Sequence, residues 1–333
     1  MEEWFAPVVP SAPPPASSVL VLAPHPDDEV FGCGGLLSLY RATASAVHVQ
    51  VLTDGAGYLP VAQRQAIFAV RQAETRQALA QLNVQSVDFS GYADRSLSLR
   101  ADLTEVVMRS IQHHGANVVL APSLWEIHPD HLATARAAVG AVAQLIKAGH
   151  TAPTLMFYEI GAPQRCDCLV DITSVWPGKD RAMQCFASQI AVQKYARHIE
   201  ALNIYRTYTL PPSVRYAEAY AVVSTHALAA QMDAGADLLR GVMDRWTQLA
   251  LAAATAHAET LQTSTASTQH HNGQLQQQLG LLGAQCLQAR EQATQSQAAL
   301  MASQKEQQNL LTSHSWRVTA PLRAVTRWLR RQQ

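Results

Sequence analysis

The sequence predicts an α/β fold, namely a Rossmann-like, mostly parallel sheet with helices on both faces, followed by a C-terminal helical or coiled-coil extension. Short apolar segments alternate with longer helical patterns through the first part of the 333-residue chain. This alternation is typical of parallel sheets. After about Thr225 the composition changes, and Ala, Gln, Leu, Ser and Thr predominate. The length allows about two domains.

The elements are predicted in order from these patterns. The predicted strands span residues 18–24, 47–52, 86–89, 117–121, 155–160, 169–172 and 217–223. The predicted helices span residues 61–83, 101–114, 132–147 and 178–189. Residues 1–17 precede them as a Pro-, Ala- and Ser-rich arm, a composition typical of flexible segments.

A polar cluster follows the first predicted strand directly, as His-Pro-Asp-Asp-Glu at residues 25–29. Charged residues at the C-terminal end of a buried parallel strand usually belong to a site, because α/β sheets place their ligands there. His25 and Asp28 can turn toward one point, and an imidazole nitrogen with a carboxylate oxygen suits Zn²⁺. Asp27 lies between them, where it can act as a base beside the metal.

A second polar cluster, His-Pro-Asp-His at residues 128–131, lies between the strand predicted at 117–121 and the helix predicted at 132–147. Two clusters at the ends of two strands can meet at one metal. Two nitrogens, one carboxylate and an open position are typical of a catalytic zinc site and not of a structural one.

Together, residues 24–29 and 128–131 resemble the PIG-L/LmbE family of zinc-dependent deacetylases of N-acetylglucosamine-type sugars. The resemblance covers residues 18–226, which form the predicted deacetylase domain. Further matching motifs lie at residues 32–35, 53–55, 71–74, 188–189 and 217–220. The resemblance implies a hydrolase that removes an acetyl or other acyl group from the amide nitrogen of a GlcNAc-like sugar, in cell-surface glycan or glycoconjugate biosynthesis.

The resemblance also assigns roles to the two clusters. It implies that His25, Asp28 and His131 hold Zn²⁺, although Fe²⁺ fits the same ligands. Asp27 is expected to take the proton of a water molecule and to pass it later to the leaving amine. His128, taken as protonated, is expected to stabilise the oxyanion or to donate a proton.

Four more residues complete the predicted site. Asp130 is expected to orient one of the histidines, with a helix N-cap as an equal alternative. Glu29 is expected to accept hydrogen bonds from backbone amides near the turn and not to bind the metal. By resemblance, Arg71 and Asp94 contact the sugar or its aglycone. For Arg71 the alternative is a surface ion pair with Glu74.

One position departs from the family pattern. In some members a tyrosine two residues before the first histidine of the second motif assists the oxyanion. Glu126 stands there in this chain. The resemblance therefore leaves open how the oxyanion is stabilised and whether the substrate differs.

Composition and charge limit the classes of partner. The chain is 48% hydrophobic and 15% charged, and its formal net charge is zero, which offers nucleic acid no electrostatic attraction. Five cysteines without a disulfide framework suggest reduced thiols in an intracellular setting. No apolar run reaches the ~18 residues of a membrane span, and the N-terminus does not resemble a signal peptide. We therefore expect a cytoplasmic protein.

The C-terminal part suggests contacts with partners. In the Ala/Gln-rich segment 227–312, a stripe through Leu275, Leu279 and Leu282 has the 4–3 spacing of a coiled-coil seam. It predicts a long self-associating helix, with a partly disordered Gln-rich tether as the alternative. Residues 313–333 resemble the tail of bacterial enzymes that build surface polysaccharides.

This tail has the pattern of a basic amphipathic helix, which can lie on an anionic membrane at its inner face. A solvated terminal helix is the alternative. Three functions therefore stay open: the deacetylase above, a deacetylase of a thiol-cofactor or secondary-metabolite sugar precursor, and a catalytically silent interaction protein that acts through its helical tail. The intact set of site residues argues against the third.

Overall fold

The computed structural model describes residues 7–57, 59–84, 86–233, 238–319, 321–324 and 327. The chain divides into two units, Met1–Ala254 and Thr255–Gln333. The first unit contains the sheet with its covering helices, and the second is helical. Each unit is described by itself.

Among the described residues, seven strands form one sheet in the order β3-β2-β1-β4-β5-β7-β6. The first five strands are parallel, and β7 is antiparallel to both of its neighbours. The predicted mostly parallel sheet is therefore confirmed. The strands are β1 (Ser18–Ala23), β2 (Ala46–Thr53), β3 (Ser86–Tyr92), β4 (Val118–Pro122), β5 (Thr154–Tyr158), β6 (Cys168–Asp171) and β7 (Ala217–Val223).

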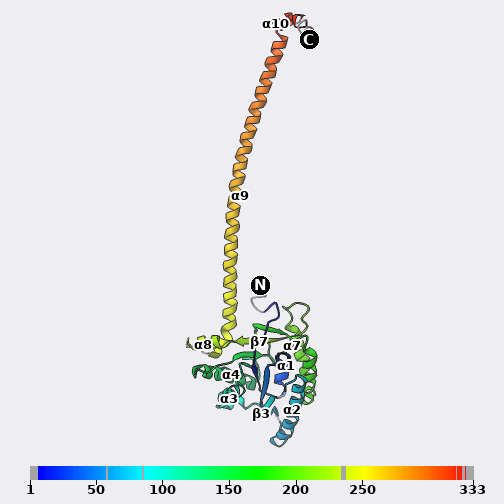
Figure 1. Cartoon of the computed structure of the whole chain (residues 1–333), viewed down its shortest axis with the longest axis vertical. Helices are drawn as coiled ribbons and strands as arrows, with labels where there is room; N and C mark the ends of the chain where they lie inside the picture. The colour runs from blue at the N-terminus through cyan, green and yellow to red at the C-terminus, as the bar shows by residue number, and fades with distance from the viewer. Residues whose placement is uncertain are drawn as a thin grey trace. The chain divides into compact units, whose positions relative to one another are not determined.

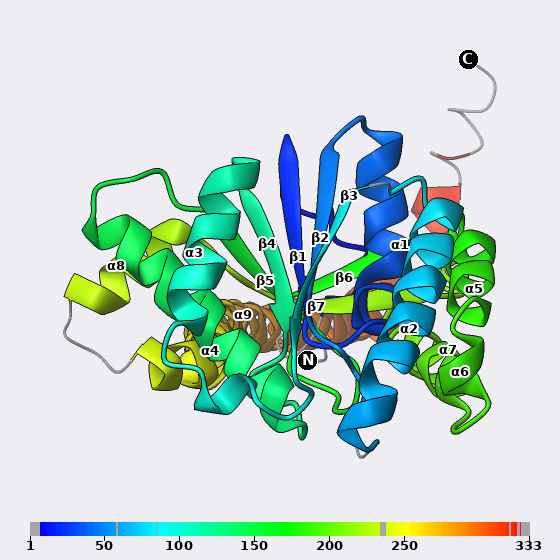
Figure 2. The same ribbon diagram turned by 90° about the horizontal axis from the view of Figure 1, so that it is seen from below.

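Helices cover both faces of this sheet (Figure 2). One face carries α1 (Asp28–Ala42), α2 (Val61–Gln81), α5 (Trp176–Gln184), α6 (Ala187–Ile190) and α7 (Tyr195–Tyr205). The other face carries α3 (Leu103–His114), α4 (Pro129–Lys147) and α8 (Thr225–Asp233). Alternate residues of the buried β1 contribute to two hydrophobic clusters, Val19 and Val21 to one and Leu20 and Leu22 to the other. This explains why the strand reads as a continuous apolar run.

The helices differ from the sequence expectation in two ways. The single helix predicted at 178–189 is divided into α5 and α6, and the sequence pattern did not reveal α1 or α7. The first half of α1 is buried on all sides, so it has no polar stripe that would mark its period. Its glycines allow close packing, since a Cβ at Gly32 would lie 2.2 Å from Cδ2 of Tyr158.

A buried ion pair holds α1 in place. The helix is kinked at Cys33, and beyond the kink the backbone N–H groups of Gly35 and Leu36 donate to the Glu218 carboxylate, each at 2.8 Å. Lys179 Nζ donates to the same carboxylate at 2.7 Å, as does the hydroxyl of Tyr220 at 2.6 Å. Glu218 on β7 thus fixes the helix that follows the first polar cluster.

The C-terminal part contains α9 (Leu238–Thr312), a continuous helix of 75 residues (Figure 1), and α10 (His314–Val318). The predicted helical extension is confirmed, while its self-association stays a prediction. Leu275, Leu279 and Leu282 of the predicted seam are all exposed. Within the described ranges, no helix has the length and apolar character needed to cross a membrane.

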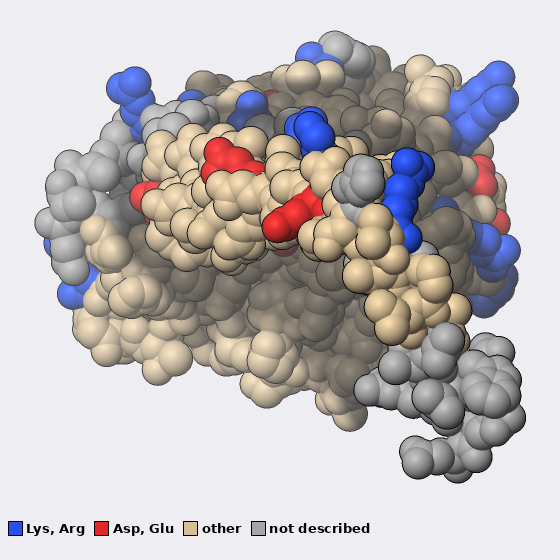
Figure 3. Space-filling view, turned by 90° about the horizontal axis from the view of Figure 1, so that it is seen from above, with Lys and Arg blue, Asp and Glu red and all other residues tan. Residues whose placement is uncertain are grey.

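Charged side chains are scattered on the face shown in Figure 3, where uncharged residues predominate. This agrees with the low charged fraction of the chain. Several residues of the predicted basic tail, namely Val325, Trp328, Leu329, Arg330 and Arg331, lie outside the described residues.

Candidate metal centre

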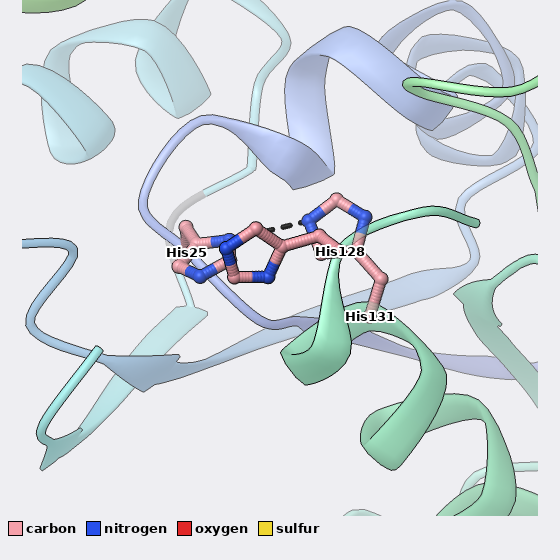
Figure 4. A group of neighbouring side chains, drawn as sticks. All are labelled: His25, His128 and His131. Carbon is pink, nitrogen blue, oxygen red and sulfur yellow. Dashed lines mark hydrogen bonds between the residues drawn. The ribbon is translucent and has the colours of Figure 1, made fainter. Parts of the chain in front are cut away.

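The two polar clusters meet at the centre of the sheet. β1 and β4 are neighbours, and the strand order runs outward from them in opposite directions. In open α/β sheets, ligands bind in the crevice at the carboxyl ends of such strands. Residues 25–29 follow β1 and residues 128–131 follow β4, so His25, His128 and His131 converge there (Figure 4).

Three side-chain atoms form a nearly equilateral triangle at this point. His25 Nδ1 lies 3.1 Å from Asp28 Oδ2 and 3.2 Å from His131 Nε2, and His131 Nε2 lies 3.2 Å from Asp28 Oδ2. All three side chains are buried. Two ring nitrogens and a carboxylate oxygen at this separation can share either ring protons or a cation.

The triangle fits a zinc ion. Around tetrahedral zinc with bonds of about 2.0–2.2 Å, neighbouring ligand atoms lie about 3.3–3.6 Å apart. The observed separations are only slightly shorter. Two other groups of possible ligands occur among the described residues, with atoms within 4.8 Å of one another: His25 with His128 and His131, and His25 with Asp94 and Asp130. We favour the triangle with Asp28 because its atoms lie closest together.

The outer nitrogen of His25 faces two carboxylates. Nε2 lies 3.3 Å from Asp130 Oδ2 and 3.3 Å from Asp94 Oδ1. Asp130 is itself held by the backbone N–H groups of Arg95 at 2.6 Å and Leu97 at 3.0 Å. This contact places Asp130 where it can orient a ligand histidine. Asp94 also accepts from Gly57 N, and its expected sugar contact stays a prediction.

Asp27 occupies a strained backbone position in contact with Arg71. Its φ of 132° lies in a region that residues other than glycine rarely adopt. Its Oδ2 lies 2.9 Å from Arg71 Nη2, and the same guanidinium donates to the carbonyls of Gly55 and Pro26, each at 2.5 Å. Arg71 is buried and holds the turn that presents Asp27. Its expected contact with sugar stays a prediction.

The environment prepares Asp27 for proton transfer. Burial raises the pKa of Asp27 to about 7, against the opposing effect of Arg71. A carboxyl group with a pKa near 7 is well matched to general-base work at neutral pH. Glu29 is fully buried beside it and accepts a hydrogen bond from the Asp27 backbone N–H at 3.1 Å. Burial, together with the Asp27 charge, raises the pKa of Glu29 to about 8.

His128 is the N-cap of α4. Its Nδ1 accepts from the Asp130 backbone N–H at 3.2 Å. Burial lowers its pKa, and so do the nearby charges of His25 and His131. The structure therefore favours a neutral ring that carries its proton on Nε2, in contrast to the protonated form that the resemblance implies. Such a ring remains a hydrogen-bond donor.

One weak signal in the sequence concerned a further contact. Glu126, noted only as a departure from the family pattern, lies with Oε2 3.4 Å from His131 Nδ1. Its side chain is almost completely buried. The contact between Arg71 and Asp27 had no signal, because it joins residues 44 positions apart in the chain.

The fold and site together define an α/β protein with a cluster of histidines and carboxylates that could hold a metal ion, at the switch point of its sheet. The chain belongs to the PIG-L family, whose model, described as GlcNAc-PI de-N-acetylase, matches residues 20–142. The predicted family membership is therefore confirmed.

Two curated relatives show the range of the similarity. A probable N-acetyl-alpha-D-glucosaminyl L-malate deacetylase 2 of Bacillus anthracis is 28% identical over 194 residues, which cover 53% of this chain and 82% of the relative. A 4-oxalmesaconate hydratase of Pseudomonas putida is 31% identical over 205 residues, with 54% and 77% covered.

Among solved structures, the N,N'-diacetylchitobiose deacetylase of Pyrococcus horikoshii matches with a TM-score of 0.56 and 22% identity. The match covers 63% of this chain and 85% of that one. At this level of identity the likeness concerns the fold alone. The predicted fold class is thus supported by both the strand order and a solved relative.

Proposed function

We propose that this protein is a zinc-dependent N-deacetylase that removes the acetyl group from a GlcNAc-like sugar. The observation that carries the proposal is the triangle of His25 Nδ1, Asp28 Oδ2 and His131 Nε2, with sides of 3.1–3.2 Å. Fe²⁺ would fit the same ligands. Relatives named as deacetylases of N-acetylglucosaminyl malate and diacetylchitobiose support the choice of substrate class.

The reaction adds water across the amide bond. His25, Asp28 and His131 would hold the zinc ion, which when bound makes water acidic and polarises a carbonyl group. Asp27 accepts a proton from the water molecule while the water oxygen forms a bond to the carbonyl carbon. Asp27 then returns this proton to the sugar nitrogen as the C–N bond breaks, so that acetate and a free amine leave.

His128 stabilises the oxyanion in this scheme. With Nδ1 occupied by the Asp130 backbone N–H, only Nε2–H is available for donation. A neutral donor placed beside the site can stabilise the charge that develops on the carbonyl oxygen. Asp94 and Arg71 remain candidates for substrate contacts, since both lie close to the ligand histidine or to Asp27.

A hydratase is the second candidate function. The relative from Pseudomonas putida, named as a 4-oxalmesaconate hydratase, matches at 31% identity over 77% of its length. A base such as Asp27 and a donor such as His128 could also serve the addition of water to a carbon–carbon double bond.

An activity screen separates these functions. The full-length protein is loaded with Zn²⁺ and incubated with free GlcNAc, UDP-GlcNAc, lipid-linked GlcNAc and 4-oxalmesaconate. We expect release of acetate and a free amine from a GlcNAc compound, lost on chelation and restored by Zn²⁺. Turnover of 4-oxalmesaconate alone would establish the hydratase. No turnover of any of them would favour the catalytically silent interaction protein.

The helical extension is proposed to bring copies of the enzyme together at a membrane. Between Thr260 and Ala289 the sequence carries no charged residue, so few ion pairs can support an isolated helix there. A coiled coil through the exposed leucine seam would cover that surface. The basic tail would then bring the enzyme to the cytoplasmic face of an anionic membrane, where cell-surface glycans are assembled.

A further inference from the structure

We propose that Glu126 is a positioning residue for the metal centre, which fixes the proton of His131 on Nδ1 so that the lone pair of Nε2 faces the metal. This inference rests on the metal-binding part of the proposed function. It does not depend on which substrate the enzyme takes. It also gives a role to the motif position at which some family members have a tyrosine and this chain has Glu126.

The Glu126 carboxylate is held rigidly by the backbone that follows β5. Its Oε1 accepts from the N–H groups of Ile160 at 2.8 Å, Gly161 at 3.0 Å and Ala162 at 3.3 Å. Its Oε2 accepts from Gly161 N at 3.0 Å. Only 1% of the side chain is exposed. The carboxylate is therefore fixed by a loop that belongs to neither metal-binding cluster.

The remaining contact of this carboxylate is with His131. Oε2 lies 3.4 Å from Nδ1, which is buried and has no hydrogen-bond partner among the described residues. This separation is longer than an ideal hydrogen bond. Even so, Oε2 is the acceptor that faces Nδ1, and a buried ring N–H needs an acceptor.

The contact determines the state of the ring. A carboxylate offers acceptors only, so a neutral His131 gains from Glu126 only with its proton on Nδ1. The unprotonated nitrogen is then Nε2, which lies 3.2 Å from both His25 Nδ1 and Asp28 Oδ2. Histidines that bind metals commonly donate their other N–H to a carboxylate, which fixes the tautomer and the ring orientation.

The two ligand histidines are thus supported from opposite sides. Asp130 faces the outer nitrogen of His25, and Glu126 faces the outer nitrogen of His131. The alternative role for Glu126 is to anchor the loop at 160–162. An anchor would affect the stability of the fold, but it would not by itself set the protonation of His131 or the affinity for metal.

The test compares Glu126→Gln with wild type in the full-length protein. The amide keeps the shape of the side chain but replaces one acceptor oxygen with an NH₂ group. If the NH₂ group faces the backbone N–H groups, two donors oppose each other. If it faces His131, it favours the tautomer with the proton on Nε2 and not on Nδ1. Glu74→Gln is the matched control, because Glu74 also accepts from a backbone N–H, that of Ser188 at 2.8 Å, outside the metal centre.

Zinc affinity is measured by competition with a chromophoric chelator, and metal-free stability by thermal unfolding. We expect the Kd for Zn²⁺ to rise about 10- to 100-fold in Glu126→Gln and to stay unchanged in Glu74→Gln. A Kd within twofold of wild type in Glu126→Gln would overturn the proposal. Loss of deacetylase activity with unchanged zinc affinity would also overturn it, whereas weakened zinc binding would support it even if no GlcNAc compound is turned over.

A second measurement needs no variant and therefore remains decisive if Glu126→Gln does not fold. Nitrogen NMR of the zinc-loaded wild type, labelled at histidine, identifies which ring nitrogen of His131 carries the proton. Zinc on Nε2 requires the ring proton to lie on Nδ1 with or without Glu126, so the informative quantity is the exchange of this proton with solvent. We expect slow exchange, because Glu126 accepts the proton in a buried contact. A proton on Nε2, or a rapidly exchanging proton on Nδ1, would contradict the assigned role of Glu126.

Discussion

Three adjacent carboxyl groups, Asp27, Asp28 and Glu29, acquire different properties from their surroundings. Burial raises the pKa of all three, but His131 and His25 outweigh it at Asp28 and hold that pKa far below its usual range. Asp27 and Glu29 have pKa values of about 7 and about 8. The Asp28 anion, which contacts two histidines, suits the role of a metal ligand. Asp27, whose pKa lies close to neutral pH, suits the role of a base.

The first prediction at this scale concerns metal content. His25→Ala, Asp28→Ala and His131→Ala should each lose stoichiometric zinc, because three protein ligands leave no redundancy. Atomic absorption of the purified variants measures this directly. His113→Ala, which changes an exposed histidine on α3, is the control and should retain full metal content. Full zinc in any two of the three variants would show that the ligand set is different.

The second prediction separates catalysis from metal binding. Asp27→Asn keeps the shape of the side chain but removes the base. General-base catalysis contributes about 10²- to 10⁴-fold, so kcat should fall by about that factor while zinc content stays normal. Steady-state kinetics with parallel metal analysis tests this. Near-normal turnover would transfer the role of base to another residue, with Glu29 as the next candidate.

The third prediction uses the contact between Arg71 and Asp27. Asp27 works as an anion, and the guanidinium 2.9 Å away favours that anion and lowers its pKa. In Arg71→Met the pKa should rise, and the acidic limb of kcat/KM should move to higher pH by about 1 unit or more. Arg64→Met, on the same helix, is the control. A raised KM with an unmoved limb would instead indicate that Arg71 contacts the sugar.

At the scale of elements, α1 connects the site to the core. Its first turn carries Asp28 and Glu29, and beyond the kink at Cys33 its backbone is held by Glu218. The Lys179 ammonium beside Glu218 is completely buried. An intact buried ion pair adds little to the free energy of unfolding compared with well-packed apolar side chains in its place. Removing one partner, however, is strongly destabilising, because it leaves an uncompensated buried charge.

The fourth prediction follows from this arrangement. Glu218→Gln should lower the free energy of unfolding by about 3–5 kcal/mol, because Lys179 loses its counter-charge. Chemical denaturation of the full-length protein measures the change. Glu105→Gln is the control, since it breaks an exposed ion pair with Arg109 and should cost no more than about 1 kcal/mol. If the two substitutions lower the free energy of unfolding equally, the buried ion pair contributes no more to stability than the exposed one.

At the scale of the whole molecule, the compact catalytic unit extends beyond the point where the sequence composition changes. Leu228 of α8 is buried in the hydrophobic cluster that also contains residues of α3 and α4. The first unit runs to Ala254. A truncation meant to remove the extension should therefore end after residue 254 and not near Thr225.

The fifth prediction compares this truncation with the full chain. The truncated protein should keep its activity on a small soluble substrate, but it should lose both self-association and binding to anionic vesicles. The full chain has five arginines and no acidic residue after Glu306, and each basic residue near an anionic surface contributes about 1 kcal/mol. Light scattering after size exclusion and co-sedimentation with vesicles are the measurements.

Two further observations decide how this result is interpreted. Binding to anionic vesicles should weaken as salt rises, because exposed charges are screened, and neutral vesicles should pellet little protein. If the full chain binds neither anionic nor neutral vesicles, the tail is better explained as a docking helix for a protein partner. A monomeric full chain would remove the coiled-coil proposal.

The sequence by itself determined the fold class, the two clusters of polar residues and the strand ends that carry them. This was possible because a buried strand reads as an apolar run, and because the polar residues at its end cannot be explained by burial. The long helix after residue 238 was also predicted from its composition and spacing. The helix α1 was not, because its first half is buried on all sides and carries no amphipathic period.

Only the tertiary structure decided which atoms face one another. The contacts of Arg71 with Asp27 and of Glu218 with Lys179 and α1 join segments that are distant in the chain. The contact of Glu126 with His131 is local in sequence, but it depends on how the loop after β4 turns into α4. Each depends on directions in space that no local pattern encodes. The ring state of His128 was likewise decided by its position as the N-cap of α4, because a single backbone N–H occupies its Nδ1.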